Sequence, residues 1–194
     1  MTFNKQLLSM LIGGALATAA SAQTVRIANQ GDALSLDPHS LNESLQLSVD
    51  SNAYEALVGW NKKLEMVPML ATSWKQSSPT VWRFELRKGV KFHDGTPFTA
   101  DDVLFTLGRI MADGSDMKSY GTDIKESRKI DSHTVEIETK APQPILPQIL
   151  SQVYIMSQKW CEANNAVKPV DRRKGVENVA SFKTNGTGPF HVRE

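Results

Sequence analysis

Cysteine is almost absent from this chain of 194 residues, since Cys161 is the only one. A single cysteine excludes a disulfide within the chain, and Cys161 lacks the spaced cysteines and histidines that would bind zinc with it. We therefore expect Cys161 to pack as a small apolar residue rather than to act as a reactive thiol.

A long apolar run is also missing. The apolar stretch at 7–20 is broken by Ser9 and by two glycines, and it is shorter than the roughly 20 residues of a membrane-spanning helix. Lys5 precedes this stretch, and small residues follow it at 20–22. These features are typical of a cleaved signal peptide at 1–22 rather than of a buried N-terminal helix. The mature protein is therefore expected to begin at Gln23 and to be periplasmic.

Neither charge sign is in excess, because 22 lysines and arginines stand against 21 aspartates and glutamates in an even mixture. This balance indicates neither nucleic acid nor an anionic membrane as a partner. None of the four histidines lies in a nucleophile or metal-binding motif, which argues against an exported hydrolase. We expect no catalytic residue, no metal ligand and no cofactor.

Alternation of apolar and polar residues predicts three short strands, at 24–28, 81–86 and 134–139. A polar loop at 29–41 follows the first of them, and residues 77–79 are expected to form a polar turn. Each predicted strand would bury one face only.

Apolar residues at helical spacing predict a helix at 44–57. Thr99 and Asp102 form a capping box that opens a second helix. A third helix, rich in Ile and Leu, is expected at 142–153. The mixture of strands and amphipathic helices indicates an α/β or α+β fold.

Two stretches carry a long motif with fixed spacing: PMLATSW at 68–74 and WRFELRKGVKFHDGTPFTADDV at 82–103. Taken alone, these residues are structural, because they supply a sheet face, glycine turns and a helix cap. Shorter segments flank them in a matching order: LDPH at 36–39, YEAL at 54–57, KIDSHTVEIET at 129–139 and GTGPF at 186–190. Together these stretches resemble extracellular solute-binding protein family 5, the peptide- and nickel-type substrate-binding proteins of ABC transporters.

The resemblance implies an α/β, periplasmic binding protein-like fold of class II, in which two lobes close around a ligand without catalysis. Family members are more than twice as long as this chain, so we expect only the N-terminal part of the fold. On the family's pattern, domain I begins at 23–47, is interrupted by an inserted domain II at 48–181, and resumes at 182–194. A turn at 186–190 would lead into a further strand.

The implied function is to capture peptides or a related small solute for an ABC permease in the inner membrane, and such proteins are expected to be monomers. Dipeptides, longer peptides, glutathione, opines, haem and nickel chelates remain open as ligands. A second hypothesis is that this chain is a truncated remnant that binds nothing alone.

The resemblance places the ligand-facing loop of the family at Asp32, Ala33 and Leu34. The Asp32 carboxylate would pair with a cationic amine such as a peptide N-terminus. The alternative is that Asp32 only solvates a Gly-Asp turn. Tyr120 is a further candidate, whose ring either faces the cleft or packs in the core.

His93 and Asp94 are neighbours in the central motif, and imidazole and carboxylate groups occur together in many catalytic and metal sites. A third partner at suitable spacing is missing. We therefore expect this pair to be structural or solvent-exposed.

Overall fold

The computed structural model describes residues 29–192. The predicted signal peptide and the predicted strand at 24–28 lie outside the described residues. Asn29 and Gln30 belong to a separate N-terminal unit, and the fold described below is that of the compact unit that begins at Gly31.

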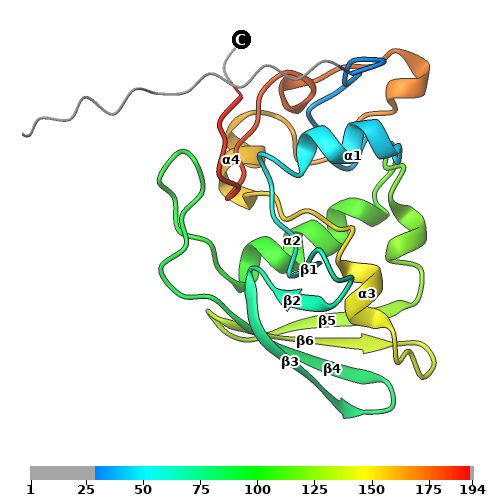
Figure 1. The fold of residues 1–194 in the computed structure, drawn as a ribbon, viewed down its shortest axis with the longest axis vertical. Helices are drawn as coiled ribbons and strands as arrows, with labels where there is room; N and C mark the ends of the chain where they lie inside the picture. Colours follow the sequence, from blue (N-terminus) through cyan, green and yellow to red (C-terminus); the bar gives the residue numbers. More distant parts are fainter. Residues whose placement is uncertain (1–28, 193–194) are drawn as a thin grey trace, which may run out of the picture. The chain divides into compact units, whose positions relative to one another are not determined.

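An antiparallel sheet of four strands forms one layer of this unit, in the order β3 (Ala71–Ser78), β4 (Val81–Leu86), β6 (Thr134–Thr139) and β5 (Ile124–Asp131). The predicted strands at 81–86 and 134–139 are confirmed as β4 and β6. They lie in the middle of the sheet, and a small hairpin of β1 (Val58–Trp60) and β2 (Met66–Pro68) precedes the sheet in sequence and is labelled with it in Figure 1.

One face of the sheet is apolar because β4 and β6 pair in register. Trp82 lies opposite Ile137 and Phe84 lies opposite Val135, and these side chains belong to the main hydrophobic cluster. Each large apolar side chain buried in this way stabilises the fold by about 1.5–3 kcal/mol. The opposite face carries charged pairs such as Arg83 with Glu136, whose Nη2 and Oε1 atoms are 2.7 Å apart.

Helix α2 (Ala100–Met111) covers the apolar face of the sheet (Figure 1). Its buried stripe of Val103, Leu107 and Ile110 joins the same cluster as the strands. The shorter helices are α1 (Ser44–Asp50), α3 (Leu146–Leu150) and α4 (Gln158–Ala163), and three single-turn 3-10 helices lie at Lys118–Tyr120, Arg172–Lys174 and Val179–Ser181. None of the helices in the described part of the chain is long and apolar enough to cross a membrane.

The predicted helix at 44–57 is wrong in its second half, because α1 ends at Asp50. Residues 53–57 bond to distant parts of the chain instead of continuing the helix. The carbonyl of Ala53 accepts from the Gly188 amide at 2.9 Å, and that of Glu55 accepts from the Ile155 amide at 2.9 Å. Tyr54 is thereby fully buried outside the helix.

Two further expectations need correction. Of the helix predicted at 142–153, only α3 is helical. The residues before Leu146 are not helical, and at the C-terminal end of α3 the Ser151 hydroxyl donates to the Gln148 carbonyl. The polar turn predicted at 77–79 belongs to β3 as far as Ser78. The strand expected after the 186–190 turn falls largely outside the described residues, which end at His191 and Val192. Within the turn, the amides of Gly188 and Phe190 bond to the carbonyls of Ala53 and Asn52.

Asp102 connects the N-termini of two helices. Its Oδ2 accepts from the Thr99 amide at 2.9 Å, which completes the predicted capping box of α2. Its Oδ1 accepts from the Gln158 amide, the first residue of α4, at 3.0 Å. Burial nevertheless raises the pKa of Asp102 despite these hydrogen bonds. One carboxylate therefore caps α2 and fixes the start of α4.

Asp102→Ala is expected to lower the free energy of unfolding by about 1–3 kcal/mol, because it leaves two partly buried amides, those of Thr99 and Gln158, without acceptors. Urea denaturation measures the effect. Asp101→Ala is the matched control: Asp101 is on the same helical turn, but its side chain is exposed in an ion pair with Lys129, so its loss should cost less than about 1 kcal/mol. Equal losses for the two variants would contradict the dual cap.

Candidate functional site

The three candidate ligand residues lie together on an open loop. The side chains of Asp32 and Leu34 are exposed, and Leu34 retains 61% of its accessible surface. Asp32 Oδ1 accepts from the Ala33 amide at 2.8 Å, which agrees with the solvated Gly-Asp turn. The loop therefore presents a carboxylate and an apolar side chain to solvent.

Two long-range hydrogen bonds hold this loop in place. The Arg172 Nε donates to the Leu34 carbonyl at 3.1 Å, across 138 positions of sequence. The Leu36 amide donates to the Ser181 carbonyl at 3.0 Å. Both partners come from the segment just before the C-terminal turn. The position of the loop therefore depends on residues from the far end of the chain.

A buried ion pair lies directly behind the loop. Arg109 of α2 donates from Nη1 to Asp37 Oδ1 at 2.8 Å and from Nη2 to Asp37 Oδ2 at 2.6 Å. Both side chains are fully buried. The bidentate contact with Arg109 holds the pKa of Asp37 below its usual value, in spite of the opposing effect of burial. Residues of the LDPH motif are thus anchored on α2.

His39 completes this anchor as a neutral imidazole. Arg109 Nη1 lies 2.8 Å from His39 Nδ1, and because a guanidinium only donates, Nδ1 must accept and the proton must be on Nε2. His39 Nε2 then donates to the Tyr154 carbonyl at 2.9 Å. Burial and the charge of Arg109 lower the pKa of His39 to about 3. This histidine is a structural hydrogen-bonding group at neutral pH.

Tyr120 is not brought together with the loop by any hydrogen bond among the described residues. Its ring is partly buried against the main hydrophobic cluster, and its hydroxyl lies 3.5 Å from Asn42 Oδ1. Asn42 lies between the loop and α1. Core packing accounts for most of what Tyr120 contacts.

His93 and Asp94 bind the C-terminal turn. The His93 amide donates to the Gly186 carbonyl at 2.9 Å, and its Nε2 lies 2.8 Å from the Gly188 carbonyl. Asp94 exchanges two hydrogen bonds of 2.9 Å with Asn185, one through its amide and one through its carboxylate. The motif at 82–103 therefore holds the NGTGPF segment at 185–190 against the rest of the unit.

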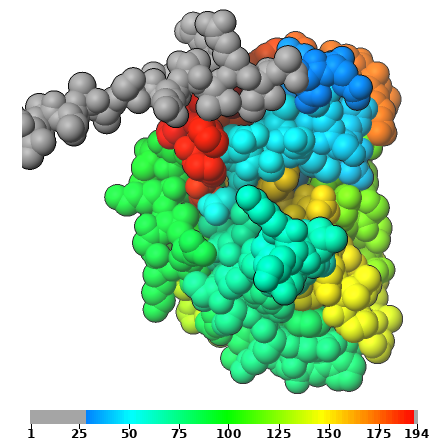
Figure 2. Space-filling model, in the orientation of Figure 1, coloured from blue at the N-terminus to red at the C-terminus, as the bar shows by residue number. Residues whose placement is uncertain are grey.

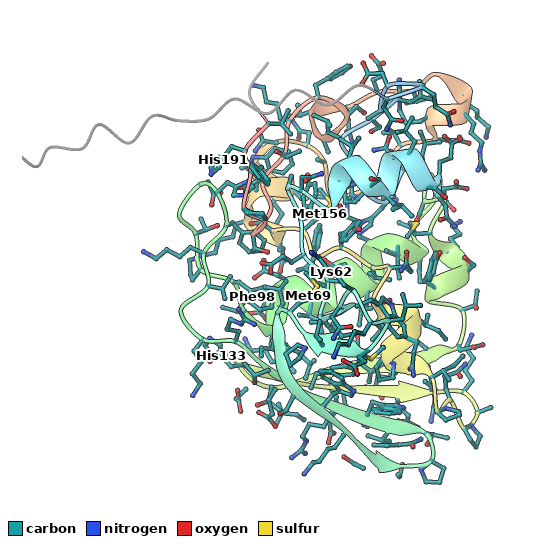
Figure 3. All side chains as sticks on the ribbon, in the orientation of Figure 1. Lys62, Met69, Phe98, His133, Met156 and His191 are labelled. Atoms are coloured by element: carbon teal, nitrogen blue, oxygen red, sulfur yellow. The ribbon has the colours of Figure 1, made fainter. Side chains whose placement is uncertain are left out.

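The side chains around His93 do not form a metal site. His93 stacks on His191 with ring centroids 3.8 Å apart, and Figure 3 shows His191 on the C-terminal segment, well separated from His133 on the turn between β5 and β6. Across residues 29–192, no group of three or more metal-binding side chains gathers. His93 therefore stacks on the His191 ring and bonds to the backbone of the C-terminal turn.

A surface hollow of about 400 Å³ lies near the end of the loop, beside Ser40. Two of its three cations are paired within it, because Arg173 donates to both carboxylate oxygens of Asp116 at 2.7 Å and Lys174 lies 3.3 Å from Asp171. The third, Lys118, lies 3.4 Å from Asp113. A hollow in which each such cation already faces a carboxylate has little free charge to attract an anion.

Cys161 is buried as expected, with no exposed surface. Burial raises the pKa of its thiol to about 12, so the reactive thiolate is disfavoured. The residues that sequence reasoning missed are Arg109, Arg172 and Asn185. Two of them carried a signal in the sequence. Arg109 is a polar residue on the apolar side of a predicted helix, and Asn185 is an asparagine beside the glycine turn.

The model for bacterial extracellular solute-binding proteins, family 5 Middle, matches residues 65–194. The glutathione-binding protein GsiB of Shigella dysenteriae is 29% identical over 177 residues, which cover 90% of this chain and 33% of that protein. The chain therefore spans about a third of the length of the curated relatives it matches.

Solved structures show the same fold. DppA from Helicobacter pylori, in complex with the peptide STSA, is 26% identical with a TM-score of 0.66, over 82% of this chain and 34% of that one. NikZ from Campylobacter jejuni, in complex with Ni(L-His), has a TM-score of 0.71 at 23% identity, over 83% of this chain and 31% of that one. The expected periplasmic binding protein-like fold of the family 5 type is confirmed. Since the family model matches most of its length, this chain belongs to the bacterial extracellular solute-binding proteins of family 5.

Proposed function

We propose that the chain is part of a substrate-binding component of an ABC importer, which captures peptides or a related small solute in the periplasm. The observation that carries this proposal is the family match over residues 65–194. The protein would be exported through a cleaved signal peptide at 1–22, act as a monomer, and deliver its ligand to a permease in the inner membrane.

The domain arrangement proposed with this function assigns 23–47 and 182–194 to domain I and 48–181 to an inserted domain II. Two hydrogen bonds join the proposed domain I segments to domain II close to these boundaries. The Leu36 amide donates to the Ser181 carbonyl, where the chain would return to domain I. The Gly188 amide donates to the Ala53 carbonyl at the other boundary, and Figure 2 shows the C-terminal segment in red against the cyan α1 segment.

The proposed ligand contacts are Asp32, Ala33 and Leu34, with Tyr120 as a secondary one. Support comes from the exposure of the loop tip and from its anchoring by Arg172 and the Asp37–Arg109 pair. An exposed carboxylate on a fixed loop is suited to a cationic amine, and Leu34 offers apolar contact beside it.

A ligand with a free amino group is consistent with two of the relatives. One is named a glutathione-binding protein, and another was solved with a bound peptide. Both of those ligands carry an α-amino group, which would be the partner of Asp32 in this chain. We therefore propose small peptides, glutathione included, as the ligand class.

Calorimetric titration of the purified protein with glutathione, dialanine and their N-acetylated forms tests the proposal. Binding is expected only with a free amine, and Asp32→Asn should weaken it by about 10–100-fold, because a hydrogen bond to a charged group contributes about 1.5–3 kcal/mol. Asp113→Asn is the control, since that side chain is 99% exposed and lies outside the proposed site.

The two ways in which this proposal can fail are distinguishable. Binding that Asp32→Asn leaves unchanged would contradict the proposed site and keep the function. A protein that binds neither peptides nor glutathione, yet unfolds cooperatively, would contradict peptide capture by this chain.

A further inference from the structure

A buried carboxylate, Asp50, lies at the end of α1 without a cation of its own among the described residues. The residue is only 1% exposed. Gln46 Nε2 donates to Asp50 Oδ2 at 2.8 Å, whereas Asp50 Oδ1 has no hydrogen-bond partner within residues 29–192. The hydroxyl of Tyr54, one turn further along and fully buried, also lacks a partner there.

The charges around Asp50 do not balance when it is ionised. Asp37 is the second buried carboxylate in this region, and Arg109 is its partner. Arg109 uses Nη1 and Nη2 for Asp37, shares Nη1 with His39, and donates from Nε to the Ala166 carbonyl at 3.2 Å. These bonds use four of the five N–H groups of the guanidinium, and among the described residues neither a hydrogen bond nor an ion pair joins Arg109 to Asp50. An ionised Asp50 would thus be an unpaired charge in a buried site, and such a group tends to take up a proton.

The other titratable groups near Asp50 supply no second cation in the described part of the chain. Tyr54 follows it in sequence, and Tyr154 from the segment between α3 and α4 donates its hydroxyl to the Leu47 carbonyl at 3.3 Å. Burial, with the Asp50 charge adding to it, raises the pKa of both phenols. Cys161 of α4 faces Tyr54 as a neutral thiol, and His39 is neutral. Burial, with Asp37 adding to it, raises the pKa of Asp50 to about 7.

Asp50 is tied to two segments through its neighbours. Gln46 accepts from the Ser35 amide at 3.2 Å and also donates from Nε2 to the Ser35 carbonyl, so the same amide group serves Asp50 and the start of the LDPH region. On the other side, Gly186 packs so closely on Tyr54 and Ala53 that a side chain there would overlap both. The cluster of Ser35, Gln46, Asp50 and Tyr54 is thus shared by the 31–37 loop and the C-terminal turn.

We propose that Asp50 takes up a proton on folding, and that this proton fastens the 31–37 loop and the 185–190 turn to α1. Below neutrality the cluster holds a neutral acid that can donate one further hydrogen bond. Above neutrality it holds an unpaired carboxylate, which loosens both segments. This inference does not depend on the identity of any ligand.

The sign of the effect follows from the two protonation states. The pKa of Asp50 is about 7 in the folded chain, against an ordinary value of 3.8 for an exposed carboxyl. Its contribution to stability is therefore present below pH 3.8 and lost as the pH rises through 7. His39 acts oppositely, because its pKa falls from 6.5 to about 3: its contribution is present above pH 6.5 and is lost as the pH falls. Only a comparison of variants isolates Asp50.

Urea denaturation of the wild-type protein and Asp50→Asn between about pH 5 and 8.5 tests the proposal. The ratio of their unfolding equilibrium constants should change by up to about tenfold per pH unit below about pH 7, in favour of the asparagine variant as the pH rises. Asp113→Asn should follow the wild type at every pH. A ratio for Asp50→Asn that stays constant over this range would overturn proton uptake at Asp50.

Two measurements on the wild type keep the proposal falsifiable if Asp50→Asn does not fold. The Asp50 carboxyl carbon should titrate near pH 7 by NMR, and a midpoint below about pH 5 would overturn the assignment. Hydrogen exchange of the Leu36 and Gly188 amides, corrected for intrinsic rates, should accelerate relative to the Val135 amide in the sheet as the pH rises from about 5 to 7, and should level off above about pH 7. Equal protection at all three amides across this range would overturn the link to the loop and the turn.

Discussion

Arg109→Met is expected to lower the free energy of unfolding by about 3–5 kcal/mol, because it leaves the Asp37 carboxylate buried without a cation. The carboxylate would lose both hydrogen bonds from the guanidinium. His39 Nδ1 and the Ala166 carbonyl would lose theirs as well. A loss of this size is a large fraction of the roughly 5–15 kcal/mol by which most domains are stable. Much of the variant should therefore be unfolded, which circular dichroism and urea denaturation would detect.

A double variant separates the cost of the unpaired charge from that of the lost packing. Asp37→Asn with Arg109→Met leaves no buried charge in this pair, so its loss should be smaller than the sum of the single losses. Arg83→Met is the partly exposed control, because Arg83 pairs with Glu136 on the solvent-facing side of the sheet, and its loss should stay below about 1 kcal/mol. Similar losses for Arg83→Met and Arg109→Met would contradict the anchoring role of the buried pair.

The anchor explains why an exposed loop can have a defined position. The tip at Asp32–Leu34 is held by Arg172 through the Leu34 carbonyl, and the residues on its C-terminal side are fixed by Arg109 and Gln46. A ligand that binds such a loop does not have to order it, and therefore loses less conformational entropy on binding. The buried polar groups behind the loop thus serve the proposed site without touching a ligand.

Elements with local signals could be predicted from the sequence. The strict alternation of Trp82, Phe84 and Leu86 specified β4, and the spacing of Thr99 and Asp102 specified the start of α2. Both signals involve residues within a few positions of one another. The resemblance of the central motif to family 5 added the fold of the larger unit, which the comparisons confirm.

Elements that depend on distant partners could not be predicted. The edge strands β3 and β5 are exposed along most of their length, so they lack an apolar alternation and exist because β4 and β6 offer hydrogen bonds. Likewise, α1 stops at Asp50 because the carbonyls of Ala53 and Glu55 bond to residues far along the chain. Helical periodicity across 44–57 was present, but tertiary hydrogen bonds were the stronger effect.

The candidate site shows the same limit. Its exposed residues, Asp32 to Leu34, were reached through a resemblance, and they remain a prediction. The contact of Asp37 with Arg109 joins residues 72 positions apart, and that of His93 with Gly188 joins residues 95 apart. No spacing rule covers such pairs. For a buried arginine such as Arg109, a sequence pattern predicts its position on a helix but does not identify the carboxylate that pairs with it.

Gly186→Ala is expected to lower the free energy of unfolding by about 3 kcal/mol or more, because overpacking against parts that cannot yield is costly. A methyl group at Gly186 would overlap the Ala53 carbonyl oxygen and approach Tyr54 Cδ1 to 2.8 Å. Backbone and a fully buried ring cannot move aside as a flexible side chain does, so the turn itself must shift. The shift would also break the hydrogen bonds of His93 and Asp94 with the turn. Urea denaturation measures the loss.

Gly108→Ala is the matched control, because a methyl group there meets nothing within 4 Å. Gly108 lies inside α2, where alanine is favoured over glycine by about 0.5–1 kcal/mol, so the control should stabilise the protein. Opposite signs for the same chemical change would show that glycine is required in the GTGPF motif by its close approach to the Ala53 backbone and the Tyr54 ring. A general intolerance of added volume would not give opposite signs. A neutral Gly186→Ala would mean that the turn is not held against Ala53 in solution.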